Sequence, residues 1–145
     1  MPLKRHNILI FMKNFIFLTI FFLTAIACQA QNLIGLSSDE IKKYMTENRK
    51  EMSQDRVVNQ SFDYLKYSDK SDTETILFFL SSDSKCSSIR IVCDGDLKQK
   101  KIKELDDLYS KKGTDSWTDA QNGKKYQIKA VSSEWSFSIT IEPEN

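Results

Sequence analysis

Alternation of apolar and polar residues is the strongest pattern in this chain, and it recurs in several short segments. The clearest case is EWSFSITIE at residues 134–142, in which every second side chain is apolar. Strict alternation of this kind is typical of a β-strand with one buried face. Short runs that alternate, or that are continuously apolar, predict strands over 61–68, 74–81, 86–94, 116–121, 124–132 and 134–142.

Two other segments repeat their apolar residues at helical spacing. Residues 38–51 carry apolar side chains near one helical face, and a second stripe runs from Leu97 to Tyr109. Ser37 and Glu40 have the spacing of a capping box, in which each side chain binds the backbone N–H of the other residue. The sequence therefore predicts two helices, the first of which begins directly after Ser37.

Two tight connections join neighbouring strands and determine the predicted fold. Four polar residues at 82–85 separate two of the strands, and Asn122-Gly123, a strong signal for a two-residue hairpin, separates two others. The elements then follow the order α-β-β-β-α-β-β-β. We expect the α+β class, with an antiparallel sheet of about six strands and both helices packed on one face.

Residues 1–30 have the features of a secretory signal peptide. An apolar run of about 13 residues, from Phe15 to Ala27, follows a lysine and precedes small residues. Because a helix needs ~20 apolar residues to cross a bilayer, we expect no transmembrane span in the mature chain. Met12 is an alternative start that would give a more compact signal. The prediction is a signal peptide over 1–30 and a single α+β domain over 31–145.

Two processing sites fit the end of this signal. Cleavage after Ala30 would leave Gln31 as the first residue, with Cys28 and Ala30 as the small residues that the peptidase requires. Alternatively, AIAC is an imperfect lipobox and Cys28 becomes a lipidated first residue, whose acyl chains would anchor the protein to a membrane. The sequence leaves both alternatives open, and the mass of the mature N-terminus would separate them.

Loss of the signal would change both the charge and the chemistry of the chain. It removes three basic residues and the only histidine, His6, so the net charge changes from +1 to −2. Acids and bases are interleaved in the remainder, which argues against a nucleic-acid partner. Without histidine, residues 31–145 lack the usual nucleophile systems and the imidazole sites for zinc or copper. We predict no catalytic, cofactor or metal site.

The remaining cysteines, Cys86 and Cys93, both fall in the strand predicted over 86–94. Seven residues of extended chain place them on opposite faces and roughly 23 Å apart, whereas a disulfide needs Cα atoms within about 7 Å. They should therefore not form a disulfide with each other. Cys93 shares a face with Ile89 and Ile91 and should pack in the core. Cys86 shares a face with Arg90 and should be partly exposed.

The strand over 74–81 is apolar on both faces, which is unusual for a sheet covered on one side only. Ile76 and Phe78 lie on one face, and Leu77 and Phe79 on the other. One explanation is that residues 52–61 or the N-terminal segment cover the second face. The other is an interaction surface, because contiguous exposed apolar area often marks one. Its candidate residues are Leu77, Phe79, Val92 and Tyr67.

The sequence FFLTAIACQAQ, the chain length and the element order resemble those of small exported proteins common in Gram-negative bacteria. The resemblance implies a location in the periplasm or cell envelope, or secretion, and it implies no particular activity.

From the residues themselves, we expect a non-enzymatic binding module of the periplasm or cell surface, with a protein or an envelope component as its partner. Two alternatives stay open. One is a lipid-anchored structural protein of the envelope, and the other is an enzyme that uses carboxylates together with Lys or Tyr side chains.

Overall fold

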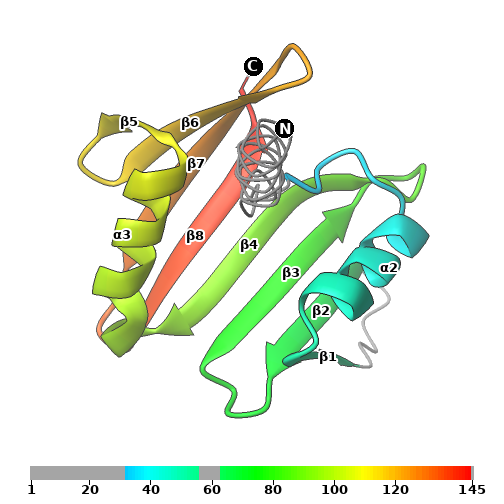
Figure 1. Ribbon diagram of the computed structural model, residues 1–145, viewed down its shortest axis with the longest axis horizontal. Helices are drawn as coiled ribbons and strands as arrows, with labels where there is room; N and C mark the ends of the chain where they lie inside the picture. The colour runs from blue at the N-terminus through cyan, green and yellow to red at the C-terminus, as the bar shows by residue number, and fades with distance from the viewer. Residues whose placement is uncertain (1–31, 56–62, 145) are drawn as a thin grey trace, which may run out of the picture. The chain divides into compact units, whose positions relative to one another are not determined.

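One antiparallel sheet of eight strands forms the framework of the computed structural model, which describes residues 32–55 and 63–144 (Figure 1). The helical elements are α2 (Ser38–Asn48), the short 3₁₀ helix η1 (Gly95–Leu97) and α3 (Lys98–Leu108). The strands are β1 (Met52–Asp55), β2 (Tyr64–Asp69), β3 (Glu74–Leu80), β4 (Cys86–Asp94), β5 (Ser110–Gly113), β6 (Ser116–Gln121), β7 (Lys124–Ser132) and β8 (Ser136–Pro143). Their order across the sheet is β1-β2-β3-β4-β8-β7-β6-β5.

The sheet consists of two similar halves. In each half, one helix precedes a meander of four strands, and the last strands of the halves, β4 and β8, pair at the centre. Both helices lie on the same face of the sheet (Figure 1). We call the other face, which no described element covers, the open face.

The predicted fold was wrong in the number of strands and in the order of elements. The sheet has eight strands, and each helix is followed by four strands rather than three. The unpredicted strands are β1 and β5, the two edges, whose sequences MSQD and SKKG do not alternate between apolar and polar residues. Main-chain pairing with one neighbouring strand is enough to form such an edge strand, so the pattern of its side chains does not reveal it in the sequence.

Two local predictions are confirmed. Ser37 caps α2 in a capping box, in which its backbone N–H donates to Glu40 Oε2 at 2.8 Å. The β6–β7 hairpin turns at Asn122 and Gly123, whose φ angles of 52° and 75° are those of a type I′ turn. The first helix ends at Asn48, three residues before the predicted end.

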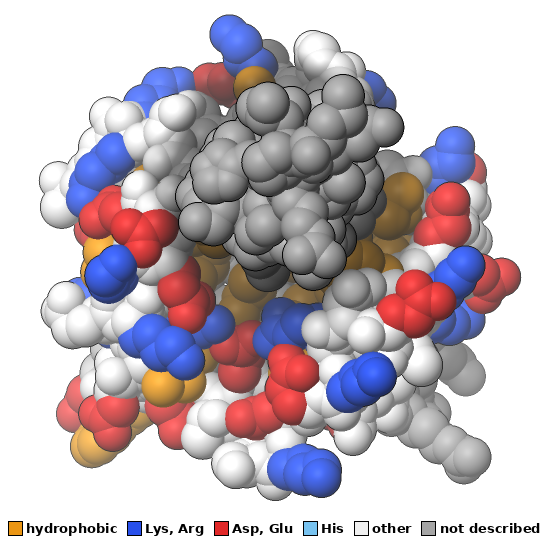
Figure 2. All heavy atoms as spheres, in the orientation of Figure 1, with side chains coloured by type: hydrophobic (Ala, Val, Ile, Leu, Met, Phe, Trp, Pro, Cys, Tyr) orange, Lys and Arg blue, Asp and Glu red, His pale blue; other side chains and the backbone are white. Residues whose placement is uncertain are grey.

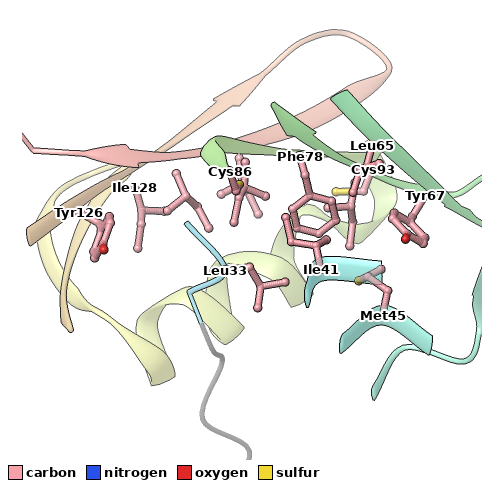
Figure 3. Close-up of a cluster of buried hydrophobic side chains, with 14 of the residues drawn as sticks. Leu33, Ile41, Met45, Leu65, Tyr67, Phe78, Cys86, Cys93, Tyr126 and Ile128 are labelled. Atoms are coloured by element: carbon pink, nitrogen blue, oxygen red, sulfur yellow. The ribbon is translucent and has the colours of Figure 1, made fainter. Parts of the chain in front are cut away.

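The hydrophobic core lies between the sheet and its two helices. Alternate residues of the central strands point into it and pair across the sheet, as Phe78 does with Ile89 and Ile91 does with Ile139. Figure 3 shows Ile41 of α2 beneath Phe78 in this layer. The most completely buried side chains are Trp117, Phe78, Phe137, Ile41, Ile128 and Ile139.

One buried carboxylate lies in this apolar layer, that of Glu74 on β3. It accepts hydrogen bonds from Arg49, just after α2, at 2.9 Å, and it contacts Lys101 of α3 at 2.5 Å. Burial disfavours the charge of Glu74, but its bonds to Lys101 and Arg49 outweigh that and lower its pKa. The cluster links both helical segments to the sheet. Elsewhere on this side of the molecule, acidic and basic side chains are interleaved (Figure 2).

Candidate interaction surface

The open face is built by the side chains that alternate with the core residues. One row crosses the sheet through the register pairs Asp55–Lys66–Leu77–Arg90–Thr140–Lys129. A second row runs through Ser68–Thr75–Val92–Ser138–Val131. The open face is thus mostly polar, as expected for an uncovered sheet face, but it carries an apolar group on β2, β3 and β4.

The apolar group is centred on Phe79. The Phe79 and Tyr64 rings are neighbours across β2 and β3, with centroids 6.0 Å apart and ring planes tilted by 44°. The guanidinium of Arg90 lies 5.8 Å from the centre of the Phe79 ring, within range of a cation–π contact. Leu77, Phe79 and Val92 are each partly exposed, so three of the four predicted surface residues lie together on this face.

Tyr67, the fourth predicted residue, is on the other face. It pairs with Ile76, is 4% exposed and packs edge-on against Phe78 in the core. Tyr64 takes the expected place beside Phe79. The alternation of apolar and polar residues within β2 indicates both placements. Tyr67 shares a face with the apolar Leu65, whereas Tyr64 shares a face with the charged Lys66.

The alternative explanation for the apolar side chains on the second face of β3 was that another segment of the chain covers them. Residues 52–55 do not cover the open face, because they form the edge strand β1. Leu33 and Leu36 pack on the helix-bearing side, where Leu33 is 4% exposed. The rest of the proposed cover, residues 56–61 and the N-terminal segment up to residue 31, lies outside the described residues. Within the described part of the chain, the open face is therefore uncovered.

The two cysteines are both buried and both free. Cys93 packs in the core, as predicted. Cys86 was predicted on the open face, but it is 2% exposed on the helix-bearing side. The reason is a β-bulge: Phe79 pairs with Ser88, but Leu80 pairs with Cys86, so Ser87 is an extra residue in β4. One extra residue reverses the alternation, and Cys86 turns inward.

Burial raises the pKa of the Cys86 thiol to about 11 and also raises that of Cys93. We therefore expect both thiols of the native protein to resist a disulfide reagent at pH 8. A pKa near 11 leaves only about one Cys86 in a thousand as the reactive thiolate. The measurement is release of the coloured thiol with and without 6 M guanidinium, which should speed the reaction at least a hundredfold. Rapid labelling of the native protein would contradict the placement of Cys86.

The pKa values of Tyr109 and Asp106 are both shifted away from neutral pH. Burial raises the pKa of Tyr109 to about 12, with a smaller contribution from Asp119. Asp106 accepts a hydrogen bond from Trp117 Nε1, which together with Lys111 lowers its pKa. Among the described residues, no three His, Cys, Asp or Glu side chains gather in a group suited to a metal ion.

The predicted signal peptide and Cys28 lie outside the described residues. In the part of the chain that the structure describes, no helix has the length and apolar character needed to span a membrane. The comparisons with known proteins add no further constraint: no family model, no curated protein and no solved structure matches this chain.

Proposed function

We propose that the chain is an exported, non-enzymatic binding module, which contacts a protein or another component of the cell envelope through its open face. The observation that carries the proposal is the apolar group of Tyr64, Leu77, Phe79 and Val92 on an uncovered sheet face. Burying such side chains against a partner removes apolar area from water and is favourable. The export signal read from residues 1–30 supports a location in the envelope.

The rigidity of the surface also supports this function. Its residues project from three paired strands rather than from loops, so a partner would order few side chains on binding. Phe79 is further held by Tyr64 on one side and by Arg90 above its ring. Aromatic residues and arginine are both enriched in protein interfaces.

The test is photo-crosslinking in the cell that exports the protein, with a photoreactive residue in place of Thr75, which pairs with Val92 on the open face. We expect a discrete crosslinked species that Leu77→Lys removes, because the charge would have to be desolvated in the contact. Leu108→Lys is the matched control, since Leu108 is 50% exposed on α3.

Both variants must give the circular dichroism spectrum and the unfolding midpoint of the unaltered protein. The proposal fails if Leu77→Lys leaves every crosslinked species in place, or if Leu108→Lys removes them equally. It also fails if no crosslinked species forms.

A further inference from the structure

Two cations that form no ion pair among the described residues lie in the middle of the open face. Arg90 on β4 and Lys129 on β7 both pair with Thr140, which lies on the strand between them. Because neighbouring strands are about 4.8 Å apart, their Cα atoms are roughly 10 Å apart. Both side chains are exposed, and among the described residues neither forms an ion pair. Lys66, in the same row, is bound by Asp55 at 2.8 Å.

We propose that the open face binds an acidic segment of a partner protein, with one carboxylate held over Thr140 between Arg90 and Lys129. This inference rests on the proposed function, and it adds the chemistry of the partner. The Arg90 guanidinium leans toward Phe79 on β3, and on binding it would turn toward β8. Long cationic side chains at this separation can then both reach a single carboxylate, and charge-assisted hydrogen bonds of this type are the strong ones. The Thr140 hydroxyl supplies a further donor at the centre.

The neighbouring apolar group specifies the second feature of the segment. Leu77 pairs with Arg90, and Phe79 lies under the Arg90 guanidinium, so the apolar and cationic parts of the surface are continuous. A segment whose carboxylate lies over Thr140 would place its next residues over Leu77 and Phe79. We therefore expect an apolar or aromatic side chain close to the acidic one in the partner.

A second copy of this chain fits the surface poorly. Face-to-face packing about the centre of the sheet would bring the Arg90 and Lys129 of one copy against those of the other. Of the acids on this face, Asp55 is bound to Lys66, whereas Glu142 is exposed two residues from Thr140 and forms no ion pair among the described residues, so it offsets only part of that repulsion. Like charges brought together in a contact cost several kcal/mol. The charge pattern therefore favours a different protein over self-association.

An anionic membrane is also a poor fit. Recognition of acidic lipids by charge typically uses clusters of four to eight Lys or Arg residues. Among the described residues, the open face offers three such residues free of ion pairs, Arg90, Lys125 and Lys129, and two of them flank a threonine on a pleated sheet. That geometry suits one localised carboxylate better than a layer of headgroups.

The experiment uses the partner identified by crosslinking at Thr75 and the protein as the exporting cell processes it. Affinity is measured by calorimetry at 0.05 M and 0.3 M NaCl for the unaltered protein and for Arg90→Glu with Lys129→Glu. The matched control is Lys43→Glu with Lys100→Glu, which makes the same charge change at exposed positions on α2 and α3. Self-association is followed by sedimentation, and vesicles rich in phosphatidylglycerol serve as the lipid probe.

We expect the open-face double variant to bind at least ~tenfold more weakly and the helix-face control to stay within about twofold. Salt should weaken binding of the unaltered protein and have little effect on the open-face variant. The inference is overturned if both double variants bind alike, if the crosslinked segment has no acidic residue, or if the ligand is a second copy or the vesicle. If Leu77→Lys weakens binding but the Arg90→Glu, Lys129→Glu double variant does not, this inference alone is overturned. If no partner is crosslinked at all, the proposed function is overturned as well.

Discussion

Replacing Glu74 by Gln should lower the free energy of unfolding by about 3 kcal/mol, because it leaves two cations without their shared carboxylate in a buried place. The side chains of Glu74 and Lys101 are only 11% and 15% exposed. Arg49 keeps Glu51, and Lys101 keeps Glu104 at 3.4 Å, so we expect a loss at the lower end of the range for broken buried pairs. Urea unfolding followed by circular dichroism measures the loss directly.

The matched control is Asp107→Asn, which breaks the ion pair between Asp107 and Lys103 on the surface of α3. Those side chains are 62% and 77% exposed, and such pairs contribute little to stability. The control should change the unfolding free energy by less than about 0.5 kcal/mol. If the two substitutions cost the same, the Glu74 cluster does not hold the helices to the sheet.

The Glu74→Gln substitution also isolates the contribution of Glu74 to the pH dependence of stability. Its pKa is lowered in the folded protein, so its contribution to stability is complete above the unfolded value of about 4.3. The contribution is lost as the pH falls from there through the folded pKa, because the unfolded chain then binds the proton first. The difference in stability between the unaltered protein and Glu74→Gln should therefore be constant near neutral pH and shrink below pH ~4.3. The other carboxylates affect both proteins alike.

The sequence predicts the parts of this molecule that are determined locally. Alternation in EWSFSITIE predicts the strand that becomes β8, and the capping box at Ser37 predicts the start of α2, because both depend only on residues close in the chain. The edge strands β1 and β5 form through main-chain pairing with one neighbouring strand, so their own side chains do not predict them.

The candidate surface likewise contains residues that the local sequence predicts and residues whose positions depend on pairing between strands. Leu77 and Phe79 were found because a strand that is apolar on both faces is visible in the sequence. Tyr67 was assigned to the wrong face, although its alternation with Leu65 in β2 indicates a core position. The prediction for Cys86 was wrong because a single bulge at Ser87 reverses the alternation in β4. Arg90 and Lys129 were not recognised as neighbours, since β8 brings them together from positions far apart in the chain.

Trp117→Ala should be the most destabilising single change in the second half of the sheet, with a cost of about 3–5 kcal/mol. Trp117 is completely buried and lies opposite Ile128 on β7, and its Nε1 donates to Asp106 Oδ1 of α3 at 2.8 Å. The substitution would leave a large cavity and remove one of the two donors to Asp106 Oδ1, and it would free α3 from β6. The unfolding free energy in urea is again the measurement.

The chain supplies its own control, because its other tryptophan, Trp135, is 79% exposed in the β7–β8 connection. Trp135→Ala should stay within about 0.5 kcal/mol of the unaltered protein. Trp117→Phe keeps most of the packing but loses the bond to Asp106, so it should cost about 1–2 kcal/mol and fold even if Trp117→Ala does not. In Trp135→Phe, the remaining indole should emit at short wavelength and resist quenching by acrylamide. Ready quenching of that emission, or a cost of Trp117→Ala no larger than that of Trp135→Ala, would contradict the packing of α3 on β6.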